Sequence, residues 1–213
     1  MQDRSVIVFD FDGTLVNSNH IKTQGFYDVI ESSAYQRDLM SSILESNPGD
    51  RSQIFIEFLS KLPGIKPLYL KNEVSLLVKK YSDYVDDMVI DAPEIQGAES
   101  LLSLLKQKKI TVVLSSATPE SNLKKIISRK GWDKYFDDIF GAPRCKKDTI
   151  LYVLKKYKIS KKDIFVVGDG VDDRLSAENI GCIFLPVGAI KLMPYETKLY
   201  SLEEVKEIVL KVK

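Results

Sequence analysis

Two aspartates, Asp10 and Asp12, directly follow an apolar run of four residues, 6–9, near the start of the chain. A short, mostly β-branched run is typical of a strand buried on both faces of a parallel sheet, and it places both carboxylates at the strand's carboxyl end. Two carboxylates this close repel each other in an apolar setting unless a cation or a proton lies between them. The pair therefore indicates a metal site or acid/base chemistry, with a solvated strand end as the alternative.

Polar side chains also follow three other apolar runs: Ser115 follows 110–114, Lys146 follows 138–140 and Asp169 follows 164–167. Parallel sheets bind ligands beyond the carboxyl ends of their strands, so we expect these residues to form one polar cluster with Asp10 and Asp12. Three carboxylates near one point favour a hard cation, and Mg²⁺ suits carboxylates, water and a substrate phosphate. Asp10 and Asp169 are the expected side-chain ligands.

Strands and helices alternate along most of the chain, and this alternation predicts an α/β fold with a Rossmann-like parallel sheet and right-handed crossovers. Five apolar runs are the predicted strands, at 6–9, 110–114, 138–140, 164–167 and 182–185. The stretch from about 34 to 89 differs, because it reads as three amphipathic helical segments separated by Asn47-Pro48-Gly49 and Pro63-Gly64. We therefore predict a core domain of residues 1–16 and 92–213, with a helical subdomain of residues 17–91 inserted into it.

Composition excludes several classes of function. The 213 residues include 31 basic and 30 acidic side chains, for a net charge of +1, which argues against nucleic-acid or membrane-surface partners. The two cysteines show no metal or redox spacing, and no run of about 18 apolar residues occurs. We expect a soluble, cytoplasmic protein, monomeric or weakly homodimeric, with a small-molecule partner.

The stretch Asp10-Phe11-Asp12-Gly13-Thr14-Leu15-Val16 resembles the first motif of the haloacid dehalogenase-like (HAD) phosphohydrolases. Later stretches resemble that superfamily's other motifs in the same order: Ser115 the second, Gly141-Ala142-Pro143-x-x-Lys146 the third and Gly168-Asp169 the fourth. The resemblance implies that Asp10 is the nucleophile, that Asp12 is a general acid/base and that the Asp12 backbone carbonyl is a further metal ligand. Thr14 and Ser116 are expected to contact the substrate.

Two assignments within these motifs leave alternatives open. Lys146 fits the third motif as the phosphate-binding lysine, and Lys147 is the alternative one residue along. Asp173 matches the last acid of the family's G-D-x-x-x-D pattern and is expected to hold a metal-bound water or to orient Lys146. Asp172 is the alternative to Asp173, and an acid solvated at a helix N-terminus is the competing interpretation.

The helical insertion resembles the cap of the phosphoglycolate phosphatase and β-phosphoglucomutase branch, and specificity is expected to lie there. Arg51 is the candidate for an anionic or polyhydroxyl substrate contact, with a solvated helix-start arginine as the alternative. Lys22 stands roughly where sugar phosphomutases of this branch carry histidine, which counts against mutase activity. We therefore expect a Mg²⁺-dependent phosphomonoesterase that acts on a small metabolite such as a sugar phosphate. A sugar phosphomutase and a phosphonate hydrolase using Lys22 are the alternatives.

Overall fold

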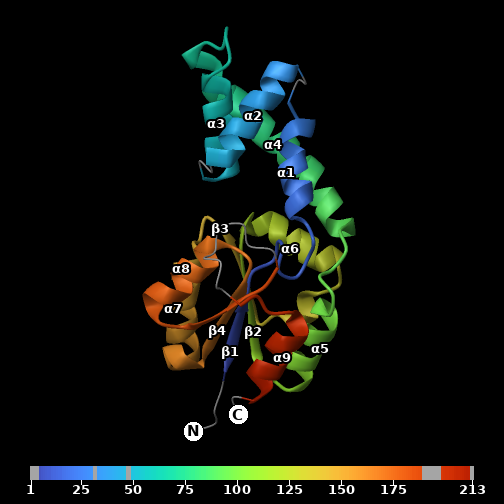
Figure 1. Cartoon of the computed structure of the whole chain (residues 1–213), viewed down its shortest axis with the longest axis vertical. Coiled ribbons are helices and arrows are strands. Elements are labelled where there is room, and N and C mark those ends of the chain that lie inside the picture. Colours follow the sequence, from blue (N-terminus) through green and yellow to red (C-terminus); the bar gives the residue numbers. More distant parts are fainter. Residues whose placement is uncertain (1–4, 31–32, 47–48, 189–197, 212–213) are drawn as a thin grey trace. The chain divides into compact units, whose positions relative to one another are not determined.

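The computed structural model describes residues 5–30, 33–46, 49–188 and 198–211 (Figure 1). The chain forms two compact units, one comprising Met1–Ser18 with Ala92–Lys213 and the other Asn19–Asp91. The first unit contains the sheet and the second contains only helices in its described part. None of the helices in the described ranges is long and apolar enough to cross a membrane.

The sheet is parallel throughout and confirms the predicted α/β fold. Its strands are β1 (Val6–Phe9), β2 (Thr111–Pro119), β3 (Asp138–Ala142), β4 (Ile164–Gly168) and β5 (Ile183–Pro186), in the order β3-β2-β1-β4-β5. All four residues of β1 are buried, as expected for a central strand covered on both faces. Because all the strands run in the same direction, their carboxyl ends meet at one edge, where Asp10 follows β1 and Asp169 follows β4.

Helices cover both faces of the sheet (Figure 1). Helices α7 (Lys146–Tyr157) and α8 (Val171–Ile180) bury Ile150, Val153 and Ala177 against the valines of β1, β2 and β4 on one face. On the other side lie α5 (Ala98–Gln107), α6 (Glu120–Arg129) and α9 (Leu202–Lys211). Burial of these apolar stripes, at about 25 cal/mol per Å² of apolar surface, drives the helices onto the sheet.

The helical unit consists of α1 (Asn19–Asp28), α2 (Ala34–Ser46), α3 (Arg51–Ser60) and α4 (Pro67–Asp91). Asp50 caps α3, since its carboxylate accepts the backbone N–H groups of Ser52 and Gln53. The rings of Phe26, Phe55 and Tyr81 pack together, with centroid separations of 4.4–6.0 Å, and they join α1, α3 and α4. The unit therefore has an aromatic core of its own.

Two element boundaries bear directly on the polar edge of the sheet. Strand β2 continues to Pro119 instead of ending before Ser115, because its pairing with β3 resumes at Pro119 and Ala142 after a register shift. A Cβ on Gly141 would lie 2.4 Å from the Thr118 carbonyl oxygen, so only glycine permits this approach of the two strands. Helix α7 begins at Lys146, which places this lysine in the first turn of the helix.

Candidate active site

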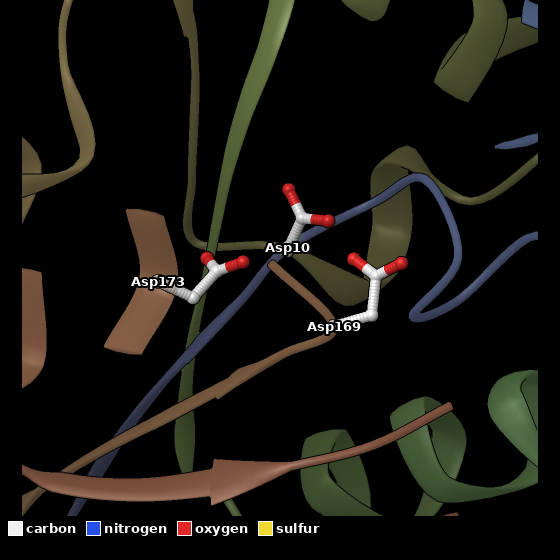
Figure 2. A group of neighbouring side chains, drawn as sticks. All are labelled: Asp10, Asp169 and Asp173. Carbon is white, nitrogen blue, oxygen red and sulfur yellow. The ribbon is translucent and has the colours of Figure 1, made fainter. Parts of the chain in front are cut away.

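Three carboxylates lie together at the carboxyl edge of the sheet. Asp10 is the first residue after β1, Asp169 the first after β4, and Asp173 lies in the first turn of α8 (Figure 2). Each side chain contributes one carboxylate oxygen, and these oxygens all lie within 4.8 Å of one another. The backbone N–H of Asp10 donates to the Val167 carbonyl at 2.9 Å, which extends the β1–β4 pairing and fixes the position of Asp10.

Lys146 supplies the positive charge of this group. Its Nζ lies 2.9 Å from Asp10 Oδ1 and 2.6 Å from Asp173 Oδ1, and all three side chains are largely buried. Burial alone would lower the pKa of the Lys146 ammonium. The charges of Asp10 and Asp173 and their hydrogen bonds outweigh burial and hold this pKa above its usual value, so the lysine is a cation.

The Asp173 side chain is fixed by a backbone hydrogen bond and by close packing against Gly168. Its Oδ2 accepts the Gly170 backbone N–H at 3.2 Å, and a Cβ on Gly168 would lie only 2.3 Å from its Cγ. Burial, followed by the nearby Asp10 charge, raises the pKa of Asp173 above its ordinary value, although the Lys146 ammonium opposes this. The carboxylates are therefore under mutual repulsion that a single ammonium does not remove.

The donor set fits a divalent metal ion. The acidic group contains only carboxylates among the residues that the structure describes, and hard cations such as Mg²⁺ prefer such oxygens. Burial and then repulsion by Asp10 raise the pKa of Asp173, and a cation among these oxygens would offset both. The residues present thus suit the Mg²⁺ expected from the sequence.

Asp12 lies beside this group and is surrounded by hydroxyls. Ser18 Oγ donates to its Oδ1 at 2.6 Å, whereas Ser116 Oγ and Thr118 Oγ1 donate to its Oδ2 at 3.3 and 3.2 Å. Sequence reasoning named Ser116 but missed Ser18 and Thr118. Residues two apart on a strand share a face, so Ser116 would point to Thr118 only in a strand that continues past 114, which the sequence does not predict.

The two residues in each pair of sequence alternatives lie in different surroundings. Lys146 contacts Asp10, whereas Lys147 is exposed; Asp173 belongs to the acidic group, whereas Asp172 is exposed. Thr14 is fully buried, with its hydroxyl 3.5 Å from Asp10 Oδ2. Ser115 is also buried, but within the described residues its hydroxyl makes no hydrogen bond to Asp10 or Asp12, and Ser116 is the serine that contacts Asp12.

Arg51 and Lys22 both belong to the helical unit. Arg51 Nη1 donates to Ser82 Oγ at 2.7 Å, and its guanidinium carbon lies 5.1 Å from the centroid of the Tyr81 ring. Lys22 is half-buried in α1, and its backbone carbonyl accepts the Tyr81 hydroxyl at 3.0 Å. The Arg51 side chain thus joins α3 to α4 rather than being the freely solvated arginine considered from the sequence.

Comparison with known proteins agrees with this fold. A family model for haloacid dehalogenase-like hydrolases matches residues 5–181, which is most of the chain. The chain therefore belongs to the haloacid dehalogenase-like hydrolase family, which confirms the resemblance stated from its motifs, and it is a hydrolase.

Individual relatives are similar along most of their length. A phosphorylated carbohydrates phosphatase of Thermotoga maritima is 26% identical over 93% of this chain and 98% of the relative. A phosphoglycolate phosphatase of Psychrobacter arcticus is 24% identical over 83% of this chain and 80% of the relative. Among solved structures, YfnB of Bacillus subtilis, described as a HAD hydrolase bound to magnesium, superposes with a TM-score of 0.71 at 18% identity, covering 97% of this chain and 99% of YfnB.

Proposed function

We propose that this protein is a Mg²⁺-dependent phosphomonoesterase that hydrolyses a small phosphorylated metabolite through an aspartyl-phosphate on Asp10. The observation that supports this most is the group of Asp10, Asp169 and Asp173 with the Lys146 ammonium, together with Asp12 two residues after Asp10. This arrangement combines a fixed nucleophile, a cation for phosphate oxygens and a separate acid/base. Phosphoryl transfer depends mainly on such positioning and charge neutralisation.

In the first step, a carboxylate oxygen of Asp10 attacks phosphorus and the bond from phosphorus to the ester oxygen breaks. Asp12 gives its proton to the departing ester oxygen, which leaves as an alcohol. In the second step, the Asp12 carboxylate takes a proton from water as the water oxygen attacks phosphorus. The bond between phosphorus and Asp10 then breaks, which releases inorganic phosphate and regenerates the carboxylate.

Three side chains are proposed to hold the non-bridging phosphate oxygens: Lys146, Ser115 and Thr14. Lys146 is a buried cation, and a fixed donor of this kind gains strength where water is excluded. Asp10, Asp169 and the Asp12 backbone carbonyl would hold Mg²⁺, and Asp173 orients Lys146. Bound Mg²⁺ would supply charge neutralisation between the phosphate dianion and the Asp10 carboxylate.

A phosphorylated carbohydrate or hydroxy acid is the proposed substrate class. The names of the Thermotoga and Psychrobacter relatives support this class, although their identity to this chain is only 26% and 24%. We further propose that the helical unit acts as a cap that selects the substrate, with Arg51 and Lys22 as its contacts. Arg51 has donors beyond the one used on Ser82, and a guanidinium suits a carboxylate or phosphate.

Phosphate release from a panel of phosphorylated sugars, hydroxy acids, nucleotides and p-nitrophenyl phosphate tests the proposal. We expect turnover with Mg²⁺, loss with EDTA and recovery on adding Mg²⁺ back. Asp169→Asn should require more Mg²⁺ for half-maximal rate, whereas the matched surface variant Asp172→Asn should not. Release that is unaffected by EDTA would contradict metal dependence. Isomerised sugar phosphate without free phosphate would favour a mutase, and phosphate release from a phosphonate alone would favour C–P cleavage.

A further inference from the structure

The Asp12 carboxylate is held by hydroxyls from two separate segments of the sheet-containing unit. Ser18 lies after the turn that follows β1, and it donates to Oδ1 at 2.6 Å. Ser116 and Thr118 lie on β2, about a hundred residues later, and both donate to Oδ2, at 3.3 and 3.2 Å. All three hydroxyl-bearing residues are at most 3% exposed, so water competes little for these hydrogen bonds.

The β2 side of this arrangement is itself fixed. The backbone N–H of Thr118 donates to Ser116 Oγ at 3.1 Å, so the Ser116 oxygen accepts one hydrogen bond and gives its proton to Asp12. Thr118 thereby acts twice, through its amide on Ser116 and through its hydroxyl on Asp12. Because both carboxylate oxygens are engaged from opposite segments, rotation of the Asp12 side chain would break at least one of these bonds.

We propose that Thr118 and Ser18 are positioning residues for Asp12: their hydroxyls fix the direction in which this carboxyl group faces the departing oxygen. This inference rests on the proposed phosphatase function, because it assigns the two residues a purpose within that reaction. Neither residue needs to touch the substrate. Sequence reasoning assigned a role to neither of them, and the family motifs that it used do not include them.

A misdirected Asp12 carboxyl group would affect poor and good leaving groups differently. General acid catalysis contributes about 10²–10⁴-fold where the leaving group is a poor one, as an alkoxide is. An aryl oxide such as p-nitrophenolate leaves without much protonation. A misdirected Asp12 should therefore slow the first step, measured by kcat/KM, much more for alkyl phosphates than for p-nitrophenyl phosphate, whereas general damage to the fold would lower kcat/KM for both alike.

The test compares three single variants of the full chain with the unmodified protein. Thr118→Val removes the hydroxyl at nearly unchanged volume, and Thr118→Ser keeps a hydroxyl. Thr111→Val makes the same change at the opposite end of β2, away from the site. For each variant, kcat and KM are measured on p-nitrophenyl phosphate and on the alkyl phosphate of the panel that the unmodified protein hydrolyses fastest, and the melting temperature is recorded.

We expect Thr118→Val to lower kcat/KM on the alkyl phosphate by about tenfold and kcat/KM on p-nitrophenyl phosphate by less than about twofold, because kcat/KM does not include the later attack of water on the aspartyl-phosphate. Thr118→Ser should restore most of the alkyl rate, and Thr111→Val should match the unmodified protein on both substrates. Equal losses on both substrates, or no loss on either, would overturn the positioning role while leaving the phosphatase function intact. An unmodified protein inactive on every phosphate ester would instead overturn the proposed function, and the positioning role with it.

Discussion

Lys146 Nζ lies 2.6 Å from Asp173 Oδ1, and this ion pair joins the first turn of α7 to the first turn of α8. The two helices follow β3 and β4, which are not neighbours in the sheet, so the contact brings both helix starts to the end of β1. Lys146 therefore has a counter-ion that is distinct from the proposed nucleophile. Asp173 can hold the ammonium in place while Asp10 changes its charge.

Removal of the Lys146 ammonium should impair turnover severely. We expect Lys146→Met to lower kcat by about 10²–10³-fold, because a fixed, buried donor to the phosphate oxygens is lost. Lys147→Met changes the exposed neighbour on the same helix and should stay within about twofold of the unmodified protein. Steady-state phosphate release measures both variants. A larger loss in Lys147→Met than in Lys146→Met would contradict this prediction and would show that Lys147 is the phosphate-binding lysine.

Substitution of Asp173 should act through the lysine and the metal site together. We expect Asp173→Asn to lower activity by about 10–100-fold, since residues that orient site groups typically contribute this much. The exposed residue Asp172 provides the matched control, and Asp172→Asn should leave kcat and the Mg²⁺ requirement unchanged. A Mg²⁺ titration of both variants checks the prediction. Equal behaviour of the two variants would contradict the assignment of Asp173.

Gly141 should not tolerate a side chain. In Gly141→Ala the new methyl group would lie 2.4–2.6 Å from backbone atoms of Thr118 and Glu120, so the ends of β2 and β3 must separate. We expect the free energy of unfolding to fall by about 1–3 kcal/mol, the usual cost of overpacking. Urea denaturation followed by circular dichroism measures it. Unchanged stability would mean that the two strand ends are farther apart than described.

The two cysteines should differ in reactivity and in pH dependence. Burial raises the pKa of the Cys182 thiol to about 11, and nearby Lys161 offsets this only in part, whereas Cys145 is exposed. The thiolate is the reactive form, so alkylation of Cys182 by iodoacetamide should be slow at neutral pH and keep accelerating up to about pH 11. Peptide mass spectrometry after timed labelling separates the two sites. Faster labelling of Cys182 than of Cys145 at neutral pH would contradict this.

Much of the architecture could be predicted from the sequence because it depends on local patterns. Apolar runs such as 6–9 identify buried strands by composition alone, and the strand ends then place Asp10 and Asp169 at one edge. A helical insertion is predicted for the same reason, since the amphipathic segments between the first two strands are interrupted by Pro63-Gly64 and lack strand patterns.

The details of the site depend on non-local geometry and could not be derived from the sequence. The serine that contacts Asp12 is Ser116, because β2 continues past the expected end and its register with β3 shifts between Ser115 and Pro119. Ser18 contacts Asp12 only because the chain turns back after Gly13, where the N–H of Gly13 donates to the Val16 carbonyl. No periodicity in the sequence encodes either contact.

The central claim is that Asp10 becomes phosphorylated during turnover. The direct measurement is mass spectrometry of peptides from a reaction quenched in acid within the first turnover, with the Asp10→Asn variant as the control. We expect the peptide containing Asp10 to gain the mass of one phosphoryl group with Mg²⁺ present, and no such gain in Asp10→Asn. Rapid phosphate release by the unmodified protein with the added mass absent, or on another residue, would contradict the proposed mechanism.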